Sequence, residues 1–230
     1  MRLSMNVIVF ASRKGGSGKS TLSVHLAAQA HRPNRPVLLI DADPQGSLTL
    51  WHRLRGGTGP ELRNGITGVS DILTSAKRAG IKWVFIDTPP NVSGVVVEAI
   101  RAATLVIVPA RLTVFDLAAV RETIEVAKAV NAPYAVVVNG APALRDNAES
   151  PFVTEMRAAI GRLEVPIWGG QITHRAIYAA ALEHGQGAHE AEPRSPAADE
   201  IGRLWSAIEK SIMAIHGLHD GAAMHHSRAA

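Results

Sequence analysis

The feature that most constrains this chain is a glycine-rich loop between an apolar strand and a helix. Residues 6–11 form an apolar run, residues 12–18 follow with three glycines, and an amphipathic stretch begins at Lys19. Glycines let the backbone turn tightly and point its N–H groups inward, and the start of the next helix adds donors and a positive dipole end. This arrangement predicts a binding site for phosphate groups within an α/β fold.

Each position of the loop has an expected contact. Lys19 is placed to reach the β- and γ-phosphates, the Ser20 hydroxyl to bind Mg²⁺ directly, and Thr21 to donate near the α-phosphate. A turn that only caps a helix would explain the glycines but not Gly18-Lys19-Ser20 at this junction. The general pattern also asks for glycine where this chain has Arg13. The predicted nucleotide-binding residues of the loop are Lys14, Gly15, Gly16, Ser17, Gly18, Lys19, Ser20 and Thr21.

The rest of the chain alternates short apolar runs with longer amphipathic stretches. Runs rich in Val and Ile are typical of strands buried on both faces, and their alternation with helices indicates parallel strand pairing. The sequence therefore predicts a mostly parallel, twisted β-sheet with helices on both faces. The expected strands are 6–11, 37–40, 83–86, 104–108, 134–138 and a shorter run at 165–168. The expected helices are 19–31, 69–79, 92–102, 114–130, 151–162, 173–184 and 197–215.

Length and composition narrow the setting. The 230 residues suit one domain, expected to span residues 1–216, with a flexible tail at 217–230. No apolar run approaches the ~18–20 residues that cross a bilayer, and the first residues do not form a signal peptide, so a cytoplasmic protein is expected. Because the chain has no cysteine, thiolate metal sites, cysteine nucleophiles and cysteine-bound iron–sulfur clusters are excluded.

Three ordered motifs in the first 90 residues resemble one family. Lys14-Gly15-Gly16-Ser17-Gly18-Lys19-Ser20 resembles the deviant Walker A motif of the ParA/MinD ATPases. Asp41-Ala42-Asp43-Pro44-Gln45-Gly46 resembles the second acidic motif of the family, and Trp83-Val84-Phe85-Ile86-Asp87-Thr88-Pro89-Pro90 its Walker B strand and switch. The later order of strands and helices fits the family to about residue 215. The resemblance implies a P-loop NTPase fold of the deviant Walker A type that hydrolyses ATP with Mg²⁺.

Three acidic residues follow apolar strands, where ligands gather in open α/β sheets. Asp41 and Asp87 are expected to hold Mg²⁺ through water molecules, and the alternative for Asp87 is a cap of the following helix at 92–102. The resemblance implies that Asp43 positions the attacking water, with a turn-forming role before Pro44 as the alternative. The predicted catalytic residues are Lys14, Asp43 and Asp87.

Two further residues take roles from the resemblance. Lys14 is expected to cross a nucleotide-sandwich dimer to the partner's phosphates and to offset charge on the transferred phosphoryl group. In an ordinary phosphate loop it would be a solvent-facing lysine. Asn139 is expected either to contact the adenine edge or to serve as a helix N-cap or turn residue. No guanine-reading Asn-Lys-x-Asp pattern is present, which favours ATP over GTP.

The resemblance narrows to ParA-like proteins. Cluster cysteines, a terminal tyrosine cluster, a basic amphipathic membrane helix and room for a glutaminase domain are all missing. ParA-like proteins form ATP-dependent homodimers that bind nonspecific DNA. An adaptor, ParB-like or other, stimulates their hydrolysis, so the ATP-bound form is expected on the nucleoid. The sequence does not identify the cargo, which could be a plasmid, a chromosome region or a protein assembly. The alternative function is a small ATP-dependent synthetase related to dethiobiotin synthetase.

Basic residues late in the chain are the expected DNA contacts. These are Arg175, Arg203 and Lys210, by analogy with the last helices of the family. A rival basic group comprises Arg53, Arg55, Arg63, Lys77, Arg78 and Lys82. The ten histidines show no ligand spacing, so no transition metal is expected.

Overall fold

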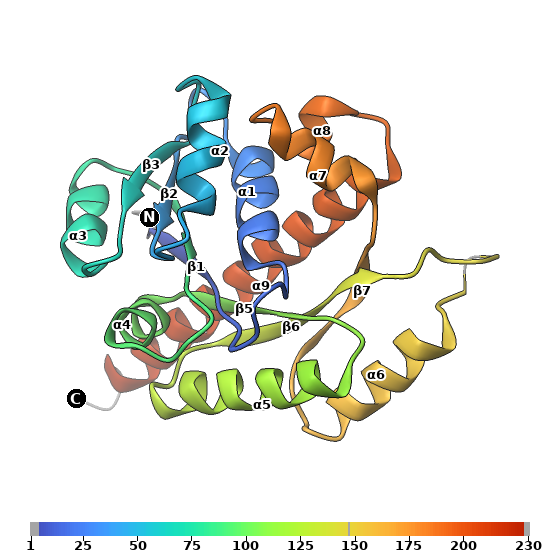
Figure 1. Cartoon of the computed structure of the whole chain (residues 1–230). Helices are drawn as coiled ribbons and strands as arrows, with labels where there is room; N and C mark the ends of the chain where they lie inside the picture. The colour runs from blue at the N-terminus through green and yellow to red at the C-terminus, as the bar shows by residue number, and fades with distance from the viewer. Residues whose placement is uncertain (1–4, 147, 228–230) are drawn as a thin grey trace.

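The computed structural model describes residues 5–146 and 148–227 (Figure 1). Within these residues the strands form one seven-stranded parallel sheet in the order β3-β2-β4-β1-β5-β6-β7, with helices on both faces. The predicted fold class is confirmed. The strands are β1 Asn6–Phe10, β2 Val37–Asp41, β3 Glu61–Asn64, β4 Trp83–Asp87, β5 Leu105–Ala110, β6 Tyr134–Ala141 and β7 Ile167–Thr173. The helices are α1 Lys19–Ala30, α2 Ser47–Arg55, α3 Ser70–Arg78, α4 Gly94–Ala102, α5 Val114–Ala129, α6 Pro151–Gly161, α7 Ala176–Glu183, α8 Ala188–Ala191 and α9 Pro196–Ser227.

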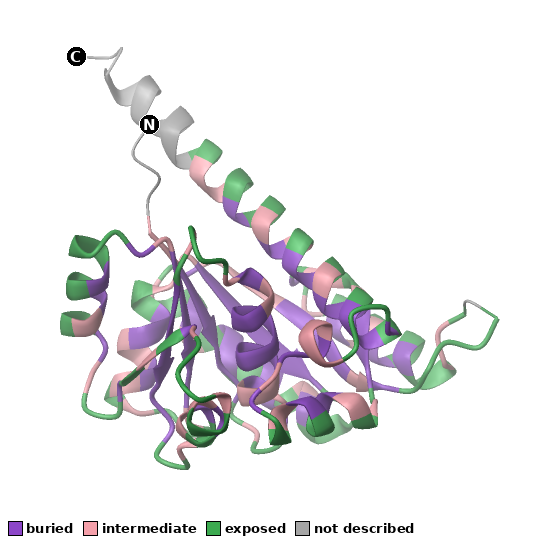
Figure 2. Ribbon diagram, turned by 90° about the horizontal axis from the view of Figure 1, so that it is seen from above, coloured by how far each residue is buried: buried purple, intermediate pink, exposed green. Residues whose placement is uncertain are grey.

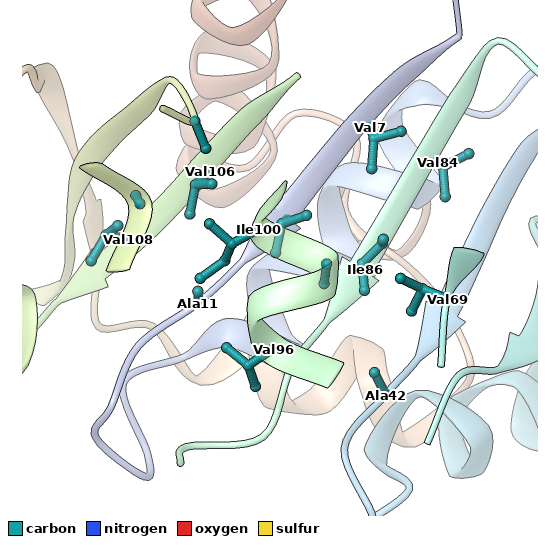
Figure 3. Close-up of a cluster of buried hydrophobic side chains, with 14 of the residues drawn as sticks. Val7, Ala11, Ala42, Val69, Val84, Ile86, Val96, Ile100, Val106 and Val108 are labelled. Carbon is teal, nitrogen blue, oxygen red and sulfur yellow. The ribbon is translucent and has the colours of Figure 1, made fainter. Parts of the chain in front are cut away.

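Successive strand residues feed two separate cores, because side chains alternate between the faces of a sheet. Val7 and Val9 point to the side covered by α3, α4, α5 and α6, where Ile100 of α4 packs against the strands (Figure 3). Ile8 and Phe10 point to the side covered by α1, α2, α7 and α9. The central strands are buried in the middle of the molecule (Figure 2). This two-sided burial explains why the central strands read as continuous apolar runs.

The strand order positions the site. Strand β1 lies between β4 and β5, so the chain moves to one side of β1 first and later crosses to the other. Ligands of open α/β sheets bind at the carboxyl ends of the strands next to such a reversal. The loop after β1, the ends of β2 and β4, and the end of β6 all lie at this edge, although they come from distant parts of the sequence.

Three elements were missed by the sequence prediction, and some bounds differ. Strand β3 at the sheet edge is polar and largely exposed, so it carries no apolar run. Helices α2 and α8 have nine and four residues and lie in segments where no helix was predicted. Strand β7 begins later and is longer than predicted. Helix α9 continues to Ser227, past the predicted end of the domain at residue 216. Gly217 costs a helix about 1 kcal/mol, which a helix already nucleated tolerates.

The division into a domain and a flexible tail stays a prediction, and residues 228–230 lie outside the described residues. None of the described helices combines the length and apolarity needed to cross a membrane.

Candidate functional site

The phosphate loop has the backbone conformation that its glycines predict. Gly16 and Gly18 have φ angles of +72° and +102°, in the left-handed region that disfavours other residues. A Cβ atom on Gly18 would lie 2.0 Å from Nδ2 of Asn139, so a side chain there would displace Asn139 from its contact with Ser17. At Arg13, where the general pattern has glycine, the backbone N–H donates to Oγ1 of Thr123 at 3.2 Å and the guanidinium pairs with Glu122 at 2.9 Å. The loop is therefore anchored on α5 at this position.

Helix α1 begins at Lys19 with no side-chain hydrogen bond to its N-cap among the described residues and no acid in its first turn. Its first backbone N–H groups thus remain available for an anion, and the helix dipole favours one. Lys19 is only 5% exposed. Burial lowers the pKa of Lys19, although the nearby Asp87 and Asp43 act in the opposite direction. The loop and the lysine together form a positive cradle for phosphate groups.

Two carboxylates stand side by side at the strand ends. Asp41 and Asp87 are partners in the register of β2 and β4, and they are 1% and 0% exposed. Burial raises the pKa of Asp87 to about 7, against the lowering influence of the Ser20 hydroxyl and the Lys19 ammonium group. Asp41 and Asp43 raise it further, because like charges disfavour ionisation. Two acids so close together and so deeply buried are suited to a bound cation.

The carboxylate oxygens of Asp41 and Asp87 show whether these residues fit a bound cation. Among the described residues, Oδ1 of Asp41 and both carboxylate oxygens of Asp87 are buried without a hydrogen bond of normal geometry. Buried acceptors normally have partners, and a hydrated cation would satisfy these. The described residues hold no group of three or more His, Cys, Asp or Glu side chains placed to chelate an ion. That agrees with Mg²⁺, which keeps several waters and binds through few protein ligands and substrate phosphates. Ser20, Asp41 and Asp87 therefore fit the predicted Mg²⁺ site.

Asp43 lies next to this group and is 8% exposed. Its Oδ1 accepts a hydrogen bond from the backbone N–H of Gln45 at 3.0 Å, so the turn-forming role considered from the sequence is present. Because Asp43 also influences the pKa values of Lys19 and Asp87, it lies within electrostatic reach of both. The turn contact holds the carboxylate at the mouth of the site, and positioning of a water molecule by Asp43 remains a prediction.

Lys14 points away from its own loop. Its Nζ donates to Oδ2 of Asp116 at 2.7 Å and to Oγ1 of Thr113 at 3.1 Å, both at the start of α5. Burial alone would raise the pKa of Asp116, but hydrogen bonds from Lys14 and Thr113 outweigh it and hold the pKa below its usual value. Neither partner of Lys14 was predicted from the sequence. Thr113 and Asp116 have the spacing of a helix-capping pair, which was the available signal.

Asn139 supports the loop directly. Its Nδ2 donates to the backbone oxygen of Ser17 at 2.7 Å, and the residue is 7% exposed. The structure thus brings the end of β6 against the phosphate loop, where the sequence placed a nucleotide contact. Another link that the sequence did not reveal joins the strand ends, because Oγ1 of Thr88 donates to the backbone oxygen of Phe10 at 2.8 Å.

The expected DNA contacts divide into two groups. Arg175 is tied to the buried Glu200 by Nε at 3.2 Å and Nη2 at 2.8 Å, and Glu200 also accepts from the Tyr178 hydroxyl at 2.8 Å. Glu200 thus joins α9 to β7 and to the start of α7, through Thr173 and Arg175, and Arg175 is not a free cation. Arg203 and Lys210 are exposed on α9 and line a shallow hollow of about 1040 Å³.

The rival basic group is not a continuous patch of free cations. Arg55 belongs to a largely buried ion pair with Glu190, and its side chain is 10% exposed. Arg63 pairs with Glu61 on the surface at 3.4 Å. Arg53, Lys77 and Arg78 of this group are exposed, as Arg203 and Lys210 of α9 are, so both groups stay candidate contacts for a polyanion.

The chain is similar to known nucleotide-binding proteins. The family model described as the CobQ/CobB/MinD/ParA nucleotide binding domain matches residues 8–211. Protein ParA of Rhizobium radiobacter is 30% identical over 221 residues, which cover 90% of this chain and 93% of that protein. The maintenance of carboxysome distribution protein A of Gloeobacter kilaueensis is 34% identical over 128 residues, which cover 51% of this chain and 55% of that protein.

Solved structures show the same fold. Apo McdA of Cyanothece has a TM-score of 0.70 at 18% identity and covers 91% of this chain and 100% of that one. The cell division ATPase MinD of Pyrococcus furiosus has a TM-score of 0.70 at 19% identity, with coverage of 90% and 99%. The resemblance expected from the three motifs is confirmed. The chain belongs to the CobQ/CobB/MinD/ParA nucleotide-binding family, and within it to the ParA/MinD type of partitioning and positioning ATPases.

Proposed function

We propose that this protein hydrolyses ATP with Mg²⁺, dimerises when ATP is bound, and binds DNA without sequence preference as that dimer. An adaptor that stimulates hydrolysis then lets the protein position a cargo. The observation that carries the proposal is the state of Lys14. This lysine belongs to the phosphate loop but is held outside it by Asp116 and Thr113, with its side chain 31% exposed. A loop lysine turned outward is placed to serve a second nucleotide site better than its own.

The proposed division of work follows from the site. The loop N–H groups and Lys19 hold the phosphates, Ser20 binds Mg²⁺, and Asp41 and Asp87 hold its water molecules. Bound Mg²⁺ supplies positive charge that offsets charge on the phosphates. Asp43, fixed by its turn contact, orients the attacking water. Lys14 of each chain then stabilises charge in the partner's site.

The proposed DNA contact uses the cations of α9. Arg203 and Lys210 are both exposed, and dimerisation doubles them. Contacts to phosphates alone carry no sequence information, which suits binding anywhere on a chromosome. If all four cations of a dimer contact phosphates, the slope of log K against log salt contains about −0.9 for each, roughly −3.6 in total.

The test uses Asp43→Ala, which should retain ATP and trap the dimer. Sedimentation with Mg·ATP should give a dimer for Asp43→Ala. Without nucleotide, both the wild type and Asp43→Ala should sediment as monomers. A monomeric Asp43→Ala protein at micromolar concentration with saturating ATP would refute the dimer. The wild type should also turn over ATP without any small co-substrate, and more rapidly with DNA and adaptor. Turnover that needs a small acceptor would instead identify a synthetase.

DNA binding is tested on the trapped dimer with two charge-reversal pairs. Arg203→Glu with Lys210→Glu should weaken duplex binding and flatten its salt dependence, with ATP affinity unchanged. Arg53→Glu with Arg63→Glu is the matched control and should have a small effect. The reverse result would assign DNA to the β3 side of the molecule, and no binding by the trapped dimer at low salt would refute the DNA proposal.

A further inference from the structure

Helix α2 connects the acidic edge of the nucleotide site to the turn between α7 and α8. At its first end, the backbone N–H and Oγ1 of Thr49 both donate to Oδ2 of Asp41, at 2.9 and 2.7 Å. The other oxygen of Asp41 is buried and has no hydrogen-bond partner within the described chain. One carboxylate thus has one oxygen engaged by α2 and one oxygen free for a metal-bound water.

At its other end, α2 grips the α7–α8 turn through polar contacts. Arg55 forms a two-pronged ion pair with Glu190, with Nη1 to Oε2 at 2.8 Å and Nη2 to Oε1 at 2.7 Å. Nη1 also donates to the backbone oxygen of Gly185 at 2.8 Å, and the Trp51 indole N–H donates to the backbone oxygen of Gln186 at 3.3 Å. Bidentate charge-assisted contacts of this kind fix geometry as well as adding energy.

The two backbones also touch at this end. A Cβ atom on Gly185 would lie 2.3 Å from the backbone nitrogen of Arg55 and 2.4 Å from its Cα, and Gly185 has a φ of +64°. Only glycine permits this approach. Because close-packed elements transmit displacement instead of absorbing it, a shift of α2 must be followed by the turn.

The α7–α8 turn also borders the face of α9 that carries Arg203 and Lys210. The backbone N–H of Ala188 donates to Nδ1 of the buried His25 in α1 at 3.0 Å, which seats the turn on the helix that starts at the phosphate loop. His189 and Pro193, just beyond the turn, line the same hollow as Arg203 and Lys210. The chain of contacts therefore runs from Asp41 to the rim of the proposed DNA surface.

We propose that α2 is a rigid strut that carries the state of the metal site to the α7–α8 turn. When Mg·ATP engages Asp41, the carboxylate shifts, and Thr49 follows because it donates two hydrogen bonds to Oδ2 of Asp41. Helix α2 then moves as a unit, and the contacts of Arg55 and Trp51 displace the α7–α8 turn. This inference rests on the proposed function, because it describes how nucleotide controls the DNA surface. Thr49 and Arg55 act as positioning residues, since neither belongs to the phosphate cradle.

Hydrogen exchange of residues 184–191 in the full-length protein, with and without Mg·ATP, tests the strut. Arg55→Met keeps a long unbranched side chain but removes the ion pair and the guanidinium group, whose Cζ lies 5.0 Å from the centre of the Trp51 ring. Glu190→Gln is the milder second variant. Arg63→Met is the matched control, because it breaks a surface ion pair on the neighbouring β3. Calorimetric ATP binding is measured in parallel.

In the wild type and Arg63→Met, Mg·ATP should slow exchange in this segment by about fivefold or more, the lower range of site-to-site coupling. In Arg55→Met and Glu190→Gln this nucleotide-dependent difference should fall below about twofold, with ATP affinity retained within about threefold. A variant that exchanges faster with and without nucleotide, yet keeps the fivefold difference, overturns the strut and leaves a structural role. No change in the wild type despite ATP binding also overturns it, whereas absence of ATP binding refutes the proposed function itself.

Discussion

Replacing Asp87 with Asn measures how much the buried carboxyl group of Asp87 destabilises the nucleotide-free protein. Asp87 is 0% exposed, and burial raises its pKa from 3.8 to about 7. Between these two values the folded state keeps the proton on Asp87 while the unfolded chain releases it. The free energy of unfolding of the wild type therefore decreases as pH rises through this window, and Asp87→Asn lacks this decrease.

The size of the effect follows from the pKa. Each pH unit inside the window lowers the contribution of Asp87 to the free energy of unfolding by about 1.4 kcal/mol, so the two units from pH 5 to pH 7 amount to about 3 kcal/mol. For a domain of this length, 1 kcal/mol moves the midpoint of thermal unfolding by roughly 2–4 °C. The melting temperature of Asp87→Asn minus that of the wild type should thus increase by roughly 6–12 °C between pH 5 and pH 8.

Thermal unfolding by circular dichroism at both pH values, in the presence of EDTA, measures this difference. Glu155→Gln, an exposed change on α6, is the control and should show no such increase. Adding Mg·ADP should stabilise the wild type at pH 8 but have little effect on Asp87→Asn. If the difference in melting temperature stays constant or shrinks from pH 5 to pH 8, Asp87 is not a buried acid held out of its ordinary range, and the electrostatic reading of the site fails.

Three further results are expected. Lys19→Ala should keep a cooperative unfolding transition but lose ATP binding by calorimetry; near-normal affinity in the folded variant would contradict the phosphate role. Asp116→Asn removes the ion pair that holds Lys14, so sedimentation with Mg·ATP should show tighter dimerisation than in the wild type, and weaker dimerisation would mean that Asp116 itself serves the dimer. Phe115 is 77% exposed beside Lys14's partners, so Phe115→Ser should change stability by less than about 0.5 kcal/mol. The same variant should weaken the ATP-dependent dimer, and an unchanged dimer would place the interface elsewhere.

The amino-acid sequence by itself was enough to predict the conformation of the glycine loop, the place of three acids after apolar strands, and the fold class. These features depend on local patterns. Glycines at Gly16 and Gly18 determine the loop conformation directly. A strand buried on both faces must be apolar along its whole length, so the central strands of a parallel sheet are readable one at a time. The carboxyl ends of such strands meet at one edge, so Asp41 and Asp87 were expected there, and the pairing of β2 with β4 makes them direct neighbours.

Only the tertiary structure decided which charges are free. Lys14 is 102 residues from Asp116, Arg55 is 135 residues from Glu190, and Arg175 is 25 residues from Glu200. A cation in the sequence looks the same whether it meets solvent or a buried carboxylate, because its partner is selected by the packing of distant elements. Hence Arg175, expected on DNA, is paired with Glu200, and Arg55 in α2 is paired with Glu190. The polar edge strand β3 was missed for a related reason, since its place is set by pairing with β2 and not by a pattern of its own.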